Sequence, residues 1–158
     1  MPRVAVVFTG GTISMRHDPV AGGNVPALSG AEILATVPGL DTIAEIVPID
    51  RGLTPASHFT FPALFGLWDA IAAALGDDAI DGVVVVQGTD TIEETAFFFD
   101  LLHAGPKPIV VTGAMRASSA PDYDGPANLR RAVAAAAATA LRGAGVVVVL
   151  SGTIEPAD

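Results

Sequence analysis

The sequence contains no cysteine, so it forms no disulfide bond and offers no thiolate ligand to a metal ion. Positive charge is also scarce, because 8 Lys and Arg residues stand against 17 Asp and Glu residues, for a formal net charge of -9. A chain with this charge repels phosphate backbones and anionic lipid, so we expect neither nucleic acid nor a membrane as a partner. The histidines share no spacing that would place them on one helical face, and no metal site is predicted at His17, His58 or His103.

Long hydrophobic runs are missing as well. The longest uncharged run of small residues, Ala132–Leu141, is about half the length that a bilayer-spanning helix needs. The apolar start of the chain is interrupted at Thr9 by two glycines, too early for the core of a signal peptide. These absences favour a cytoplasmic protein.

With 158 residues, 51% of them hydrophobic, the chain is long enough for one domain with a buried core. Short runs rich in β-branched residues predict strands at Val4–Phe8, Ile46–Ile49, Val83–Val86, Ile109–Thr112 and Val146–Leu150. The runs are apolar at successive positions instead of alternating, which is typical of parallel strands that are covered on both faces.

Helical patterns lie between these strands, and they predict helices at Gly30–Thr36, Phe61–Leu75, Thr91–Leu102 and Pro126–Leu141. Strands that alternate with helices predict an α/β fold: an open, mostly parallel sheet with helices on both faces, a flavodoxin- or Rossmann-like three-layer sandwich. The stretch from Arg16 to Leu28 is rich in Gly and Pro and has little periodicity. We expect it to be a mobile surface loop, of the kind that closes over a site.

In a sheet of this type ligands bind beyond the carboxyl ends of the strands, so the residues that directly follow the strands form the candidate site. Thr12 and Thr89 lie there beside glycines, which allow tight turns and close approach of a ligand. A threonine hydroxyl becomes a nucleophile when a base takes its proton, and backbone N–H groups stabilise the oxyanion that develops. Asp90 could hold an ammonium group or orient a base.

Other interpretations of the same residues remain open at this point. The threonines could instead cap the following helices, above all Thr91, which precedes Glu94 by three positions. Glu93 and Glu94 favour a helix N-terminus electrostatically and are a weaker candidate for an acid and base pair. The first glycine turn could cradle phosphate, but it lacks the lysine of a P-loop and the third glycine of a dinucleotide fingerprint.

Several motifs together resemble the L-asparaginase family of the bacterial type, which includes glutaminase-asparaginases. They are TGGTI at 9–13, QGTDTIEETAFFFDLL at 87–102, and KPIVVTGAMR at 107–116 followed by DGPANL at 124–129. Their order and approximate spacing match the family, and the resemblance extends from Arg3 to about Thr153. It implies that the side-chain amide of asparagine, or also of glutamine, is hydrolysed through a covalent acyl-enzyme without a cofactor.

The resemblance also implies roles for single residues. Thr12 corresponds to the nucleophile, and Thr89 and Asp90 belong to a Thr-Lys-Asp arrangement that activates water or the nucleophile. The positions implied to bind the substrate are Ser57, Gly88, Thr89, Asp90 and Ala114. Asp90 takes the α-amino group there, and Ser57 takes the α-carboxylate unless a neighbouring residue occupies that position.

The chain departs from the family pattern at several places. Gln87 replaces a histidine, which keeps a hydrogen-bonding side chain but loses a titratable one. The only tyrosine is Tyr123, whereas the family carries one in the segment that matches Gly23–Pro26. The only lysine, Lys107, precedes the fourth predicted strand, at the opposite edge from the site, whereas the family lysine follows the fifth.

The family has a second α/β domain, and a neighbouring subunit's copy of it completes each active site. We therefore expect residues 1–158 to be a single amino-terminal domain that hydrolyses asparagine poorly alone. The alternative is a catalytically silent module that binds an amino acid or serves assembly. A mean hydropathy of +0.54 also predicts a homo-oligomer. Its candidate surfaces, which could equally be core, are the helices that carry Phe97–Phe99 and Ala132–Ala140.

Overall fold

The computed structural model describes residues 1–158 and contains a six-stranded sheet with the order β4-β1-β5-β6-β7-β8. Neighbouring strands from β4 to β7 are parallel, and β8 is antiparallel to β7. The strands are β1 (Arg3–Phe8), β2 (Met15–Asp18), β3 (Gly23–Pro26), β4 (Glu45–Asp50), β5 (Gly82–Val86), β6 (Ile109–Thr112), β7 (Val146–Leu150) and β8 (Thr153–Pro156). The helices are α1 (Gly30–Ala35), α2 (Phe61–Gly76), α3 (Ile92–Leu102) and α4 (Gly125–Ala137).

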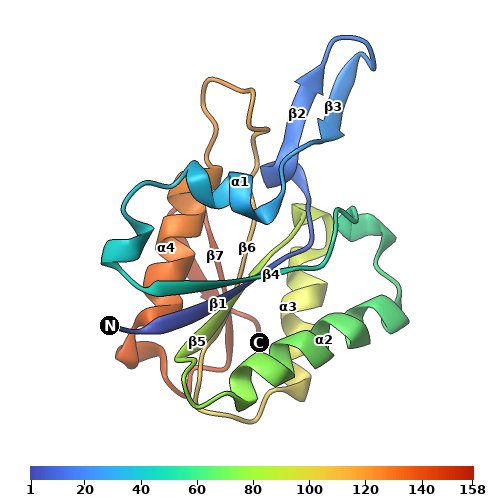
Figure 1. Ribbon diagram of the computed structural model, residues 1–158. Coiled ribbons are helices and arrows are strands. Elements are labelled where there is room, and N and C mark those ends of the chain that lie inside the picture. The colour runs from blue at the N-terminus through green and yellow to red at the C-terminus, as the bar shows by residue number, and fades with distance from the viewer.

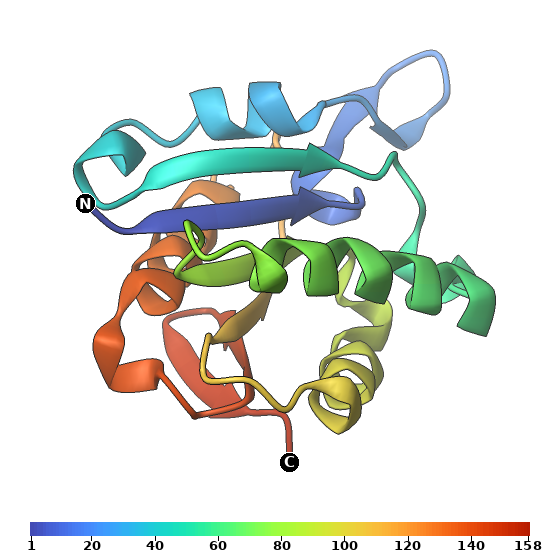
Figure 2. The ribbon, with the colours of Figure 1, turned by 60° about the horizontal axis from the view of Figure 1, so that its bottom comes forward.

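Helices cover both faces of this sheet, as Figures 1 and 2 show. One core cluster joins α1 and α4 to the sheet, and the other joins α2 and α3 to its opposite face. Successive residues of one strand enter different clusters: Val4 and Val6 pack with α4, whereas Ala5 and Val7 pack with α2. The uninterrupted apolar runs of the sequence therefore reflect burial on both faces, and the predicted three-layer α/β fold is confirmed.

The stretch from Arg16 to Leu28 was expected to be a mobile surface loop, and the expectation of a loop was wrong. Most of this segment forms an antiparallel hairpin of β2 and β3, in which Met15 pairs with Pro26 and Asp18 with Gly23 (Figure 1). The Asp18 carboxylate accepts hydrogen bonds from two backbone N–H groups of the turn. The hairpin projects from the body of the domain, so no buried face imposes the alternation by which a strand is recognised.

Two other expectations about the carboxyl-terminal part need correction. The last helix ends at Ala137 and not at Leu141, because a separate 3-10 turn spans Thr139–Leu141. The face of α4 that includes Ala132 and Ala136 is buried against the sheet, so this stretch is core and not an association surface. The small side chains allow such close packing that a Cβ atom at Gly82 would overlap the backbone of Ala136. No helix of the fold has both the length and the apolar character of a transmembrane span.

Candidate active site

The loops that follow β1, β4, β5 and β6 meet at the carboxyl ends of these strands, a region that we call the carboxyl rim. The backbone N–H and the hydroxyl of Thr9 both donate to the carbonyl of Val86, each at 3.0 Å. The N–H of Gln87 donates to the carbonyl of Thr112 at 3.0 Å, and the N–H of Thr54 donates to Thr9 at 2.8 Å. Strand-like pairing therefore continues one residue past the strands and fixes where each loop departs.

Glycines let the loops of the carboxyl rim pack backbone against backbone. Gly11 has a φ of 89°, and a Cβ atom there would overlap the backbone of Gly88. A Cβ atom at Gly113 would lie 2.5 Å from the carbonyl oxygen of Gln87. The next contact on the rim joins Gly88 to Ala56, since a Cβ atom at Gly88 would lie 3.1 Å from that methyl group. A side chain at these glycines would push the loops apart.

This packing brings the sequence-predicted residues to one rim: Thr12, Ser57, Gly88, Thr89, Asp90 and Ala114. Thr12 and Thr89 are half-buried, Ser57 and Asp90 are exposed, and Gly88 and Ala114 are buried. The side chains of Thr12, Ser57, Thr89 and Asp90 make no hydrogen bond within the chain, and neither does that of Thr54, whereas four other hydroxyl-bearing neighbours do. The bonded neighbours are Thr9, Ser14, Thr91 and Thr95, each of which donates to a backbone carbonyl.

The helix-capping interpretation of these threonines was wrong. Thr91 is the N-cap residue of α3, but its hydroxyl makes no capping bond and instead donates to the carbonyl of Ala56 at 3.3 Å. Thr89 lies in the 3-10 turn before the helix, and Thr12 opens the 3-10 turn Thr12–Ser14 after β1. The hydroxyls of Thr12 and Thr89 therefore have no structural partner and are free to contact a ligand.

Gln87 holds the loop that follows β5 through hydrogen bonds from its side chain. Its side chain is completely buried, and its amide nitrogen donates to the carbonyl of Gly88 at 3.2 Å and to the hydroxyl of Thr95 at 3.3 Å. The amide oxygen has no partner. Gln87 thus holds the Gly88 carbonyl toward the interior, which is a task for a hydrogen-bond donor and needs no titratable group.

A polar cluster that the sequence patterns did not reveal shapes the loop after β6. The Asp124 carboxylate accepts hydrogen bonds from the N–H groups of Met115 and Arg116, at 3.1 and 2.9 Å, and from the amide of Asn128 at 2.9 Å. Burial acts to raise the pKa of Asp124, but these hydrogen bonds together hold it below its ordinary value. The buried Asn128 amide also donates to the carbonyl of Gly113.

Tyr123 was likewise missed. Its hydroxyl donates at 2.8 Å to the carbonyl of Ile13, the residue that follows Thr12. Burial, and after it the charge of Asp124, raises the pKa of Tyr123 to about 12. The motif DGPANL contains Asp124 and Asn128 and lies directly after this tyrosine, but nothing in it identifies partners about a hundred residues away.

Lys107 lies at the amino ends of the parallel strands, which we call the amino rim, as the sequence predicted. Its ammonium group donates to the carbonyls of Leu75 and Asp77, at 2.8 and 2.7 Å, and so closes the end of α2. The position of Lys107 before β6 and its bonds to α2 keep it away from the carboxyl rim.

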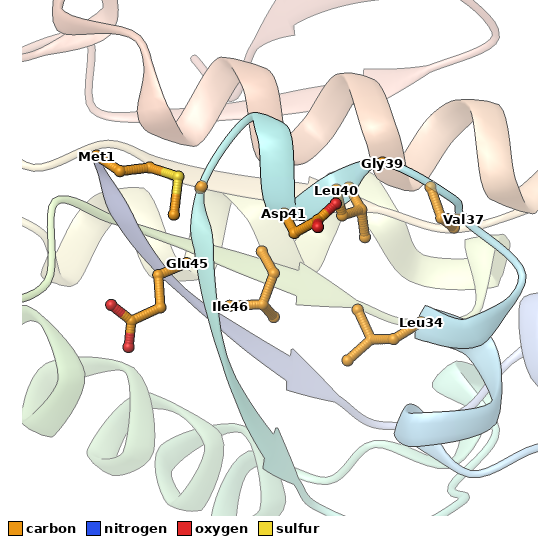
Figure 3. Close-up of a pocket in the computed structure, with 9 residues that line it drawn as sticks. Met1, Leu34, Val37, Gly39, Leu40, Asp41, Glu45 and Ile46 are labelled. Atoms are coloured by element: carbon orange, nitrogen blue, oxygen red, sulfur yellow. The ribbon is translucent and has the colours of Figure 1, made fainter.

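The largest cavity does not coincide with the candidate site. It has a volume of about 400 Å³ and lies between α1, the following turn and the outer strand β4. Figure 3 shows the apolar side chains of Leu34, Leu40 and Ile46 around it, with the carboxylates of Asp41 and Glu45 at its margin. None of the candidate hydroxyls contributes to this cavity, so the sequence motifs and the cavity mark different places.

Fold and rim together define a class: an α/β domain that presents free hydroxyls and a carboxylate where its parallel strands end. The family model for the asparaginase amino-terminal domain matches residues 3–158, and the chain belongs to the asparaginase family. This confirms the resemblance found in the motifs.

Proteins with similar sequences include L-asparaginases and a glutaminase-asparaginase. The chain is 36% identical to L-asparaginase 2 of Bacillus subtilis over 99% of its own length and 43% of that protein. It is 35% identical to a glutaminase-asparaginase of Pseudomonas aeruginosa, over 98% of the chain and 43% of the relative. A crystal structure of a probable cytoplasmic L-asparaginase from Campylobacter jejuni superposes with a TM-score of 0.92 at 34% identity, over 99% of this chain and 48% of that one. The chain thus spans less than half the length of these relatives.

Proposed function

We propose that the chain is the amino-terminal domain of an amidohydrolase that converts L-asparagine, and also glutamine, to the acid and ammonia through a threonine acyl-enzyme. One observation carries this proposal: the packing of Gly11 against Gly88 places the unbonded hydroxyls of Thr12 and Thr89 on adjacent loops. The names of the relatives support asparagine and glutamine as the substrates. The reaction needs no cofactor.

In the first step the Thr12 oxygen attacks the carbon of the side-chain amide. The hydroxyl proton passes to the amide nitrogen, the C–N bond breaks, and ammonia leaves an ester on Thr12. Water then attacks the ester carbon, its proton returns to the Thr12 oxygen, and the free acid is released. Thr89 and Asp90 relay these protons, and the backbone at Gly88 and Ala114 lines the pocket.

The substrate is held at its α-carbon end by charge and hydrogen bonding. The Asp90 carboxylate is exposed on the carboxyl rim, where it can pair with the α-ammonium group. Ser57, exposed in the neighbouring turn Ala56–His58, binds the α-carboxylate. The carboxylate and the hydroxyl together select an amino acid over a simple amide.

The proton relay lacks a lysine within these residues. Lys107 is bonded to α2 at the amino rim, and residues 151–158 after β7 include no lysine. We therefore propose that residues 1–158 are one domain of a two-domain enzyme and that they turn over asparagine slowly by themselves. Because Lys107 lies at the amino rim and cannot join the proton relay, a second candidate function is a module that binds the amino acid without hydrolysing it.

We also propose that the protein is a cytoplasmic homo-oligomer. The name of the Campylobacter neighbour supports the location. The outer faces of α2 and α3 support association, because Phe61, Phe65, Phe97 and Leu101 are 71, 50, 45 and 69% exposed. Light scattering over a concentration series measures the oligomeric state, and a monomer at high concentration contradicts this part of the proposal.

Covalent labelling of the chain tests the reaction. A diazoketone analogue of asparagine is incubated with the protein, and the tryptic peptide Val4–Arg16, which contains Thr12, is analysed by mass spectrometry. We expect an adduct on Thr12 that competing aspartate prevents. Thr12→Ala should remove the adduct completely, because alanine offers no oxygen that could displace N2 from the diazo carbon of the analogue and form the ether bond. The control Thr139→Ala changes an exposed threonine distant from the carboxyl rim and should label normally.

The labelling experiment also separates the two candidate functions. Slow ammonia release together with labelling of Thr12 supports the amidohydrolase. Binding of aspartate without labelling or ammonia release supports the silent module and contradicts the acyl-enzyme. An adduct on any residue other than Thr12 overturns the assignment of the nucleophile.

A further inference from the structure

The single tyrosine of the chain reaches across the domain to the turn that carries Thr12. Tyr123 lies just before α4, and its hydroxyl donates to the carbonyl oxygen of Ile13 at 2.8 Å, over a sequence separation of 110 residues. The Ile13 side chain is completely buried in the core cluster against which the Tyr123 ring also packs. The residue after Thr12 is therefore held through both its side chain and its carbonyl group.

The same loop after β6 holds the chain beyond Ile13. The N–H and the hydroxyl of Ser118 both donate to the carbonyl of Met15, at 2.8 and 2.7 Å. The N–H of His17 donates to the hydroxyl of Ser119 at 3.0 Å. The loop thus contacts alternate residues along the start of the hairpin, and the bond from Tyr123 is the one nearest to Thr12.

The direction of the Thr12 hydroxyl depends on the short 3-10 turn Thr12–Ser14. Within this turn the hydroxyl of Ser14 donates to the carbonyl of Gly11 at 2.7 Å, and the N–H of Met15 donates to Thr12. These local bonds set the shape of the turn, and the carbonyl of Ser14 also accepts from the N–H groups of Ala27 and Leu28, each at 2.9 Å. The bond from Tyr123 adds a link on the side of Thr12, because it joins the middle residue of the turn to the start of α4.

The tyrosine ring packs directly against the backbone of Gly125, where there is no room for a larger residue. A Cβ atom at Gly125 would lie 2.5 Å from the ring carbon that carries the hydroxyl and from the hydroxyl oxygen itself. The Tyr123 hydroxyl is protonated at neutral pH, because its ordinary pKa is 10.0 and burial raises that pKa to about 12. Its hydrogen is used in the bond to the carbonyl of Ile13.

We propose that Tyr123 is a positioning residue for Thr12, and that its hydroxyl fixes the 3-10 turn so that the Thr12 oxygen points at the substrate. This role rests on the proposed function of Thr12 as the nucleophile. It differs from a proton relay, because the hydroxyl is bonded to a backbone carbonyl and acts through the peptide.

The test compares Tyr123→Phe with the wild-type chain in labelling by the diazoketone analogue. The variant keeps the ring in its seat and removes one hydrogen bond, for which we expect the maximal labelling rate to fall about five- to tenfold. The analogue concentration that gives half of that rate should not change, because Asp90 and Ser57 bind the analogue and are untouched. A second readout is amide hydrogen exchange at Ser14 and Met15, which should become faster by a similar factor.

Two further variants make the result specific. Thr42→Val removes a hydroxyl of the same kind, which donates to the carbonyl of Gly39 at 2.7 Å, but it lies far from the carboxyl rim. This control should leave labelling unchanged. Gly125→Ala keeps the tyrosine and displaces its ring, and it should slow labelling as Tyr123→Phe does.

The outcomes distinguish this inference from the proposed function. If Thr12 labels in the wild type and equally fast in Tyr123→Phe, the role of Tyr123 is overturned while the nucleophile stands. If Thr12 does not label in the wild type, the proposed function falls and the positioning role falls with it. An increase in the half-saturating concentration with an unchanged maximal rate also contradicts positioning, since it assigns Tyr123 to substrate binding.

Discussion

The two rims of the sheet use their polar side chains in opposite ways. At the amino rim, the ammonium group of Lys107 closes the end of α2 with two hydrogen bonds. Arg3 pairs with Glu45 at 3.1 Å, and Arg142 approaches Asp81 to 3.9 Å. The three cations Lys107, Arg3 and Arg142 therefore lie beside partners within the chain and serve the fold.

At the carboxyl rim, the backbone is tightly packed and the polar side chains fall into two groups. Those of Asp124, Asn128 and Tyr123 are bonded within the chain, whereas a second set is left without partners. Thr12, Ser57, Thr89 and Asp90 make no internal hydrogen bond, although the glycines beside them fix their loops. Side chains without a partner in the fold are free to contact a ligand, which is the role proposed for these four residues. The difference teaches that the amino rim closes the ends of helices and strands, whereas the carboxyl rim keeps a set of hydroxyls and a carboxylate unbonded.

The strongest way to break this comparison is to disturb the backbone of the carboxyl rim. Gly11→Ala should cost about 3 kcal/mol or more of the free energy of unfolding, because its φ of 89° and ψ of -173° strain any other residue and its Cβ would overlap Gly88. Urea unfolding followed by the fluorescence of Trp68 measures the loss. The control is Gly22→Ala in the hairpin turn, with a φ of 69° and nothing within 4 Å, which should cost only about 1 kcal/mol. Equal losses in the two variants would show that the contact with Gly88 contributes nothing.

A smaller effect is expected at the amino rim. Lys107→Met should lower the free energy of unfolding by about 2 kcal/mol, because the two carbonyls at the end of α2 lose a charged donor. Labelling of Thr12 should not change. The matched control Arg116→Met breaks only an exposed ion pair with Asp122 and should cost less than about 0.5 kcal/mol. If Lys107→Met reduced labelling of the folded chain, the separation of the two rims would be refuted.

Much of the fold was predictable because the signals are local. Strand β5, with the four consecutive valines Val83–Val86, is apolar at each of these positions because both faces are covered, and this requires a three-layer arrangement. The hairpin of β2 and β3 was not predicted, since it has no buried face to impose alternation. The edge strand β8 was also missed, because all of its residues are exposed and carry no hydrophobic pattern.

The candidate site divides in the same way. Thr12 and Thr89 were predictable because each follows a strand in a glycine turn, and parallel strands bring such turns to one edge. Tyr123 was not, because its partner lies far away in the sequence. The distance between Tyr123 and Ile13 along the chain is 110 residues, and no spacing rule connects them. Sequence patterns thus located the residues of the candidate site better than the groups that hold their loops in place.

The smallest expected effect is the pH dependence of stability that comes from the Tyr123 hydroxyl, and it tests how tightly the carboxyl rim holds this side chain. Burial and then the charge of Asp124 raise its pKa from 10.0 to about 12, so the folded chain holds this proton more tightly than the unfolded chain. The resulting stability is complete below pH 10 and is lost as the pH rises to about 12. After allowance for partial exposure, it amounts to about 1 kcal/mol. Tyr123→Phe lacks this contribution, so the stability advantage of the wild type over the variant should shrink across that interval.

Because the chain has 1 tyrosine, the ultraviolet absorbance of tyrosinate reports the ionisation of Tyr123 directly. Asp124→Asn removes the neighbouring charge and should move the midpoint of that absorbance back toward 10.0. A wild-type midpoint already at 10.0 would mean that the hydroxyl is open to solvent, and the bond from Tyr123 to the Thr12 turn would lose its support.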